Sequence, residues 1–217
     1  MSQSFPSSEG RPVVLALIAA IQANAAYLSD IDGAIGDGDH GINMNKGFSL
    51  AAERLGEEPV GLSEGLNLLG DTLVTDIGGS MGPLYGMLFM DMGDACQGRE
   101  VIDAATFQAM LDAALAAIQS LGEAQVGDKT LVDTLVPARE AFAASVAAGD
   151  DFAMALGKMA GAAEAGKDST RDLVAKIGRA SRLGERSRGH LDPGATSCYL
   201  LLQALADSSR ALLGADG

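Results

Sequence analysis

The regular spacing of apolar residues most constrains the fold of this chain. Between residues 104 and 121 the apolar side chains form one helical face: Phe107, Leu111, Ala114, Leu115, Ile118 and Leu121. The same period predicts helices near 14–28, 42–55, 62–76, 83–97, 129–148, 152–166, 168–181 and 194–213. No Val/Ile/Thr-rich run is flanked by turn signals, and residues 71–77 continue a helical pattern. We therefore predict an all-α fold in which about eight helices run up and down.

The size and charge of the chain exclude several functions. Its 217 residues suffice for one domain or two small ones, and no linker or repeat divides them. With 29 acidic and 15 basic residues, the net charge is −14, which disfavours nucleic acid and anionic membranes as partners. Cys96 and Cys198 lie in apolar surroundings, typical of small buried residues rather than a disulfide.

The N-terminal apolar run, residues 13–25, imitates a signal peptide. However, the preceding segment is not basic, and the helical apolar spacing continues to Leu28. No apolar run reaches the roughly 18 residues that span a bilayer. We therefore expect a first helix in a cytoplasmic protein.

Three connecting stretches, 29–41, 77–86 and 178–194, are rich in glycine or charge. In an up-and-down bundle, alternate loops meet at the same end. We therefore expect ligand-binding groups from distant parts of the chain to converge there.

The first stretch contains Gly36–Gly41, GDGDHG, which matches the G-x-G-x-x-G pattern of dinucleotide-binding turns. That pattern requires a preceding strand, and here a helix precedes it. An EF-hand fails because its sixth position is Ile42 instead of Gly. The plain alternative is a solvated acidic turn. Asp32, Asp37 and Asp39 nevertheless offer the oxygen ligands that Mg²⁺ prefers, so we predict a site for two Mg²⁺ ions that let a triphosphate approach.

The second stretch, Gly78–Gly82, allows two interpretations. Its backbone N–H groups and the Ser80 hydroxyl can bind a phosphate at the start of the next helix. The same letters match G-x-S-x-G, the nucleophile elbow of serine hydrolases, with His190 and several aspartates downstream. Because an elbow needs a preceding strand and none is predicted, a hydrolase that uses Ser80 is the alternative.

The third stretch belongs to a basic island in an acidic protein. This island, Arg171 to His190, holds six of the fifteen basic residues: Arg171, Lys176, Arg179, Arg182, Arg186 and Arg188. Such a cluster can bind phosphate, or it can dock an acidic partner through residues 178–190. In the second case the chain would be an adaptor that binds no nucleotide.

His40 lies inside the acidic loop, and we expect it to contact a nucleotide.

Four blocks closely resemble the nucleotide-binding L subunit, or L domain, of dihydroxyacetone kinases: DGAIGDGDHGINMNKGF (32–48), GGSMGPLYG (78–86), GDKTLVDTLVPA (127–138) and GRASRLGERSRGHLDPGATS (178–197). The blocks follow the family's order over nearly the whole chain. The resemblance implies one nucleotide-binding domain, residues 1–217, with an antiparallel barrel of eight helices. It implies that Asp32, Asp37 and Asp39 bind two Mg²⁺ ions that bridge the phosphates of ADP or ATP. It also implies these nucleotide contacts: His40, Gly41, Ile42, Asn43, Ser80, Met81, Gly122, Leu131, Arg179, Asp192, Pro193 and Gly194.

One departure from the family pattern is Met81, where the family often has Ser, because a thioether cannot donate a hydrogen bond. In the family, dihydroxyacetone is held on a separate K subunit. The resemblance therefore implies phosphoryl transfer across an interface, with no catalytic group on this chain beyond its metal–nucleotide site.

Two mechanisms follow from the resemblance. In the first, which a chain without a K portion favours, ADP is a tightly bound coenzyme rephosphorylated from phosphoenolpyruvate by a phosphotransferase-system M subunit. In the alternative, ATP exchanges as the substrate of a two-subunit kinase for dihydroxyacetone or another short ketose or tetrose. A homodimer is compatible with both.

Overall fold

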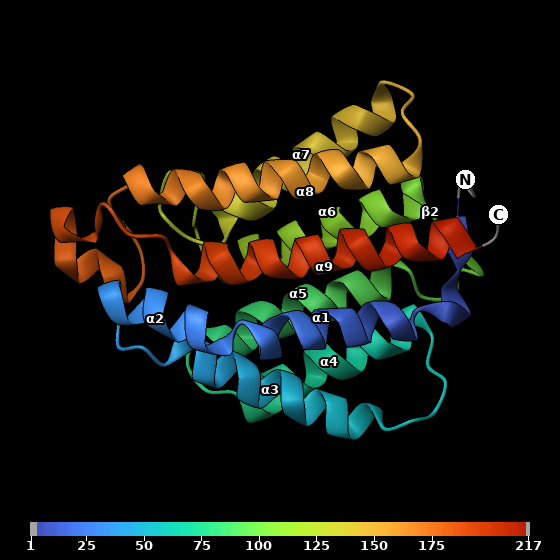
Figure 1. Ribbon diagram of the computed structural model, residues 1–217, viewed down its shortest axis with the longest axis horizontal. Helices are drawn as coiled ribbons and strands as arrows, with labels where there is room; N and C mark the ends of the chain where they lie inside the picture. Colours follow the sequence, from blue (N-terminus) through green and yellow to red (C-terminus); the bar gives the residue numbers. More distant parts are fainter. Residues whose placement is uncertain (1–3, 216–217) are drawn as a thin grey trace.

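The computed structural model describes residues 4–215, and this part of the chain is helical almost throughout (Figure 1). The α-helices are α1 (Arg11–Ala23), α2 (Ala25–Ile35), α3 (His40–Leu55), α4 (Leu62–Asp76), α5 (Met81–Ala95), α6 (Ala104–Leu121), α7 (Val132–Ala147), α8 (Phe152–Ser169) and α9 (Pro193–Ala215). Three 3₁₀ helices, η1 (Ser7–Glu9), η2 (Thr170–Asp172) and η3 (Arg179–Ser187), and two strands, β1 (Ser4–Pro6) and β2 (Val101–Asp103), complete the order. The predicted all-α class is confirmed.

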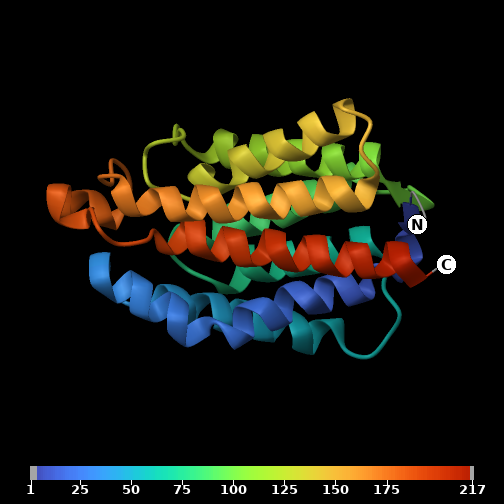
Figure 2. The same ribbon diagram turned by 45° about the horizontal axis from the view of Figure 1, so that its top comes forward.

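The helices close into an antiparallel barrel (Figure 2). Each helix from α3 to α8 packs against the next one in the sequence, and α9 packs against α1, which closes the ring. A 54° bend at Asn24 separates α1 from α2, so these two form one broken column. Counted that way, residues 4–215 fill eight antiparallel positions, as predicted.

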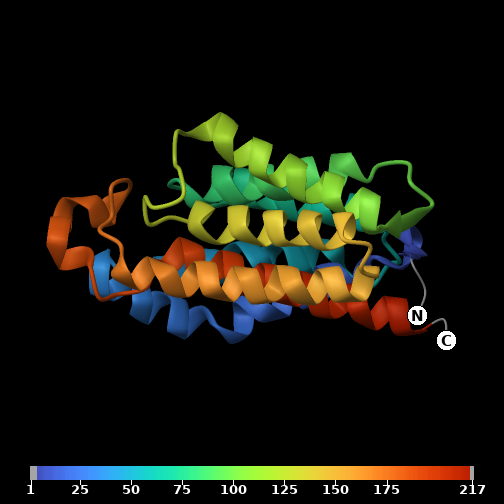
Figure 3. The ribbon, with the colours of Figure 1, turned by 90° about the horizontal axis from the view of Figure 1, so that it is seen from above.

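The two ends of the barrel differ in what they carry. β1 pairs antiparallel with β2 and contacts α9, so both ends of the described chain lie together (Figure 1). The turns that follow α2, α4, α6 and α8 gather at the opposite end, where η3 also lies (Figure 3). The up-and-down topology therefore separates the chain ends from these four turns.

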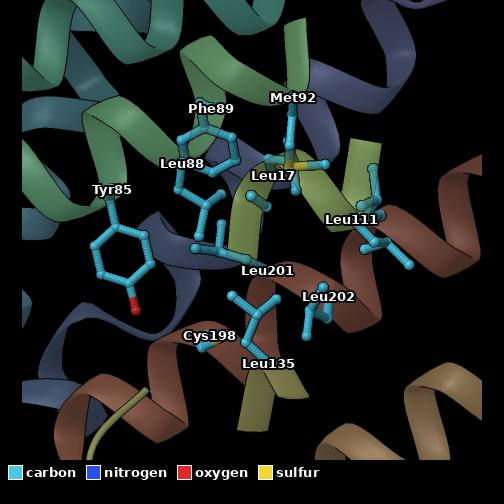
Figure 4. A pocket seen from close by; sticks show the side chains of 12 residues that line it. Leu17, Tyr85, Leu88, Phe89, Met92, Leu111, Leu135, Cys198, Leu201 and Leu202 are labelled. Carbon is cyan, nitrogen blue, oxygen red and sulfur yellow. The ribbon is translucent and has the colours of Figure 1, made fainter. Parts of the chain in front are cut away.

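Apolar side chains fill the barrel. Near the strands, a group of aromatic rings packs with centroids 5.0–6.4 Å apart: Phe5, Phe107, Phe142 and Phe152. Farther along, a cavity of about 20 Å³ remains among leucines, Met92 and Phe89 (Figure 4). That volume holds little more than one water molecule, so the centre is a packed core. Tyr85 lines this core and also reaches the gathered turns.

The elements largely follow the predicted pattern. The helix expected over residues 104–121 has those bounds, and the Asp103 side chain caps it by accepting from Thr106 N at 2.7 Å. Its predicted apolar face is buried except at Leu121, which is 46% exposed, and at partly buried Leu115. Cys96 and Cys198 are buried and form no disulfide, as predicted.

Three expectations about the elements were wrong. Residues 168–181 do not form an α-helix; α8 ends at Ser169, and η2 and η3 follow, separated by irregular chain. The first helix breaks at Asn24, and α2 continues into the stretch expected to be a loop. Two short strands exist where none was expected. Between residues 4 and 215, no single helix could cross a membrane; only the bent pair α1–α2, taken together, has the length and composition.

Candidate functional site

A cleft of about 420 Å³ opens at the end of the barrel where the four turns gather. Its volume is typical of small-molecule sites. Residues from five segments line it: 32–43, 78–85, 129–131, 177–180 and 192–194. The three stretches expected to converge therefore do so, and the turn before α7 joins them.

Three carboxylates lie together at this cleft. Asp32 is in the last turn of α2, and Asp37 and Asp39 lie in the turn before α3. At the end of α2, Gly36 N donates to Asp32 O at 2.5 Å. Gly38 has a φ of +79°, which allows the chain to reverse direction within a few residues. One oxygen from each aspartate lies within 4.8 Å of the others. Three clustered oxygen ligands on a tight turn fit Mg²⁺, which takes few carboxylates and completes its shell with phosphate and water.

A basic segment covers the acidic turn. Residues 171–189, which we call the lid, lead from the end of α8 toward α9 and contain η3. Arg179 Nη1 forms an ion pair with Asp37, and Asp39 Oδ2 lies 3.8 Å away. The side chains of Arg179 and Asp37 are about half exposed, at 58% and 50%, so solvent screens this pair and a stronger ligand can displace it.

His40, the first residue of α3, sits in a buried hydrogen-bond network. Its Nε2 lies 2.9 Å from Ser197 Oγ, which in turn lies 2.6 Å from the Tyr85 hydroxyl. The Tyr85 hydroxyl also lies 3.0 Å from Gly194 O, and Ser197 Oγ lies 3.0 Å from Pro193 O. The two hydroxyls have one proton each, so they share these carbonyl acceptors and each other. Burial lowers the pKa of His40 to about 4, against the opposing charge of Asp32, so the ring is neutral at pH 7.

The start of α9 forms another wall of the cleft. Asp192 caps this helix by accepting from Ala195 N at 2.7 Å, and Pro193 is its first residue. Burial raises the pKa of Asp192 to about 7, although the amide of Ala195 and the charge of Lys129 oppose the rise. Leu131 lies against this start, since a Cβ on Gly194 would be 3.6 Å from Leu131 N.

The start of α5 faces the same space. Gly78, Gly79, Ser80 and Met81 all line the cleft, and Gly79 has a φ of +75°. The first N–H groups of a helix have no acceptor within the helix, so this turn can donate to an anion. The element that leads into the Ser80 turn is helix α4, which ends at Asp76, and not a strand, so the serine-hydrolase elbow lacks its required geometry.

The structure brings most of the predicted site residues together. These line the cleft: Asp32, Asp37, Asp39, His40, Asn43, Ser80, Met81, Leu131, Arg179, Asp192, Pro193 and Gly194. Gly41, Ile42 and Gly122 do not. Gly41 is buried against α2, Ile42 is 65% exposed, and Gly122 follows the end of α6.

Three polar lining residues, Tyr85, Lys129 and Thr130, had no predicted role. Tyr85 lies in the quoted block GGSMGPLYG but has the spacing of a core residue. Lys129 is in GDKTLVDTLVPA and is only 1% exposed. Its position within a Gly-Asp-Lys-Thr turn is the one signal in the sequence that sets it apart from a surface lysine.

Comparisons with known proteins agree with this geometry. A family model described as the DAK2 domain matches residues 34–207. The PEP-dependent dihydroxyacetone kinase 1, ADP-binding subunit DhaL, of Listeria innocua is 42% identical, covering 85% of this chain and 88% of that protein. The corresponding DhaL subunit of Escherichia coli is 39% identical, covering 83% of this chain and 86% of its own length.

Longer relatives and a solved structure also match. The L-erythrulose kinase of Pectobacterium atrosepticum is 33% identical over 86% of this chain, which covers only 32% of that enzyme. The crystal structure of the dihydroxyacetone kinase from C. freundii, in complex with AMP-PNP and Mg²⁺, aligns with a TM-score of 0.68 at 26% identity. That alignment covers 94% of this chain and 34% of the kinase. The chain therefore belongs to the DAK2 domain family, and within it to the DhaL subunits of dihydroxyacetone kinases, as the four blocks predicted.

Proposed function

We propose that this chain is a cytoplasmic, single-domain subunit that holds ADP or ATP through two Mg²⁺ ions and passes the phosphoryl group to dihydroxyacetone on a partner subunit. The observation that carries this proposal is the trio Asp32, Asp37 and Asp39, with oxygens within 4.8 Å of one another in a 420 Å³ cleft. A protein of net charge −14 repels a polyphosphate, and bound cations at this trio remove that obstacle.

The residues around the trio supply the other contacts that a bound nucleotide needs. Mg²⁺, when bound, neutralises charge on the phosphates and favours phosphoryl transfer. Ser80 and the first amides of α5 donate to phosphate oxygens, and Arg179 reaches the phosphates from the lid. Neutral His40 offers a hydrogen bond without adding charge. The apolar lining residues Ile35, Leu84 and Ile177 suit an adenine ring.

The partners follow from the names of the relatives. Because the DhaL relatives are called PEP-dependent, we propose a K subunit that holds the sugar and a phosphotransferase-system M subunit that regenerates the nucleotide. A second candidate is an ATP-dependent kinase for erythrulose or a similar short sugar, favoured by the similarity to L-erythrulose kinase. The two differ in whether nucleotide stays bound between turnovers.

Calorimetric titration with ADP in the presence of Mg²⁺ tests the metal assignment. Asp37→Asn removes one charged ligand, and we expect it to weaken binding by about a hundredfold. Asp30→Asn is the matched control, because Asp30 is an exposed aspartate on α2 outside the trio, and it should leave binding unchanged. Equal affinities for the two variants would refute the assignment, and circular dichroism verifies that both remain helical.

Native mass spectrometry of the purified protein separates the two mechanisms. Retained ADP after gel filtration supports the PEP-dependent coenzyme role. Loss of nucleotide, together with turnover from ATP when only a K subunit is added, supports the ATP-dependent alternative. A protein that binds no nucleotide under either condition would favour the adaptor interpretation instead.

A further inference from the structure

A buried lysine joins the two ends of the lid. The Lys129 ammonium donates to Thr170 O and to His190 O, each at 2.5 Å. These carbonyls stand immediately before and after residues 171–189. One side chain therefore holds together the two points at which the lid leaves and rejoins the barrel.

The turn that carries Lys129 is itself rigidly held. The buried carboxylate of Asp133 accepts from Gly127 N at 2.5 Å and from Thr130 N at 2.7 Å. Lys129 has a φ of +63°, the only positive φ outside glycine in residues 4–215. A side chain in this costly conformation persists only where the surroundings require it. The turn also contacts the lid directly, since Lys176 N donates to Asp128 O at 3.2 Å.

Stability alone does not account for this arrangement. A buried ammonium costs free energy unless it is paired, and between residues 4 and 215 no salt bridge includes Lys129. Burial accordingly lowers the pKa of Lys129, while the charge of Asp192 opposes that change. Two backbone carbonyls at the base of the lid accept its hydrogen bonds instead. The contacts of the Lys129 ammonium are therefore better explained by a role in positioning the lid.

We propose that Lys129 is a positioning residue for the nucleotide site: it ties both ends of the lid to the cleft floor and thereby holds Arg179 over the acidic trio. This inference rests on the proposed function, in which Arg179 meets a nucleotide phosphate. Gly189 N also donates to Arg171 O at 2.7 Å across the base of the lid. Loss of Lys129 should therefore loosen the lid without releasing it.

Limited proteolysis tests the tie in the absence of nucleotide. The lid contains several exposed arginines at which trypsin cleaves: Arg171, Arg179, Arg182, Arg186 and Arg188. Lys129→Met keeps the aliphatic stem and removes the donors, so we expect cleavage in the lid to become about tenfold faster. Lys158→Met, at an exposed lysine of α8, is the matched control and should cleave like the wild type in the lid. Equal lid cleavage in both variants would overturn the proposal.

A double-mutant cycle tests whether Lys129 acts through Arg179. We expect Lys129→Met to weaken binding of ADP with Mg²⁺ by about tenfold in the wild-type background, but by less than about twofold when Arg179→Ala is present. A purely structural role predicts additive effects, which would overturn the proposal. If Lys129→Met does not fold, Lys129→Gln, which keeps N–H donors on a shorter, uncharged side chain, takes its place in both experiments.

The outcomes distinguish this inference from the function on which it rests. If wild-type protein binds no nucleotide, the proposed function fails, and lid cleavage still decides whether Lys129 ties the lid. If wild-type protein binds nucleotide and the cycle is additive, the lysine has no positioning role while the proposed function stands.

Discussion

Gly41 offers a direct test of how the backbone shapes the acidic site. It lies in the first turn of α3, where that helix crosses α2 with no room for a side chain. A Cβ at Gly41 would be 1.9 Å from Ala25 O and 2.7 Å from Ser29 N. Real Cβ contacts essentially never fall below 3.0 Å, so the two helices must separate by at least 1.1 Å to accept alanine.

The size of the effect follows from this overlap. Overpacking against backbone atoms, which cannot rotate away, costs about 1–3 kcal/mol. We expect Gly41→Ala to lower the free energy of unfolding by about 2 kcal/mol. For a domain of this size, that lowers the melting temperature by about 4–8 °C. The same separation pulls Asp32 on α2 away from Asp39, two residues before Gly41. We therefore expect weaker Mg²⁺-dependent ADP binding as well as lower stability.

Thermal unfolding and calorimetric titration measure the two effects together. Gly161→Ala is the matched control, because Gly161 is an exposed glycine of α8 at which an added Cβ would point into open space. There, alanine should stabilise the helix by about 0.5–1 kcal/mol and leave ADP binding unchanged. If Gly41→Ala is as stable as Gly161→Ala and binds ADP equally well, the close approach of α2 and α3 does not shape the site.

Three further predictions concern the rest of the site. Because burial lowers the pKa of His40 to about 4 from 6.5, the unfolded chain binds a proton between pH 6.5 and pH 4 that the folded protein does not. The contribution of His40 to the free energy of unfolding should therefore fall as pH drops through that window; an NMR titration midpoint near 6.5 would contradict this. Tyr85→Phe removes the hydroxyl bonded to Ser197 and Gly194, and should lower the free energy of unfolding in urea by about 1–3 kcal/mol. Chelation by EDTA should release bound nucleotide while circular dichroism stays unchanged, and nucleotide retention in EDTA would argue against binding through metal.

The fold was predictable wherever local signals acted alone. The helix over residues 104–121 has an unbroken apolar period and a capping aspartate, so its bounds matched. Residues 168–181 have helix-forming composition, yet Gly178 takes a φ of +75° and the base of the segment bonds to Lys129. These tertiary contacts override the local helical preference, and they leave no periodic signal in the sequence. The break at Asn24 is hidden for the same reason, because the apolar spacing runs through it.

The parts of the site that were predictable are those whose residues lie close together in the sequence. Asp32, Asp37 and Asp39 lie within eight residues, so their clustering was visible in the sequence. Tyr85 and Ser197 are more than a hundred residues apart, and only the closed barrel places their oxygens at 2.6 Å. Gly41 was predicted as a nucleotide contact, but the structure places it against α2, outside the cleft lining.

The strands that hold the start of the described chain beside the end of α9 have a practical consequence. A tether attached near either end of the described chain leaves the barrel beside the strands, a full helix length from the cleft. Surface-immobilised or fused versions should therefore capture small molecules as well as the untethered polypeptide does.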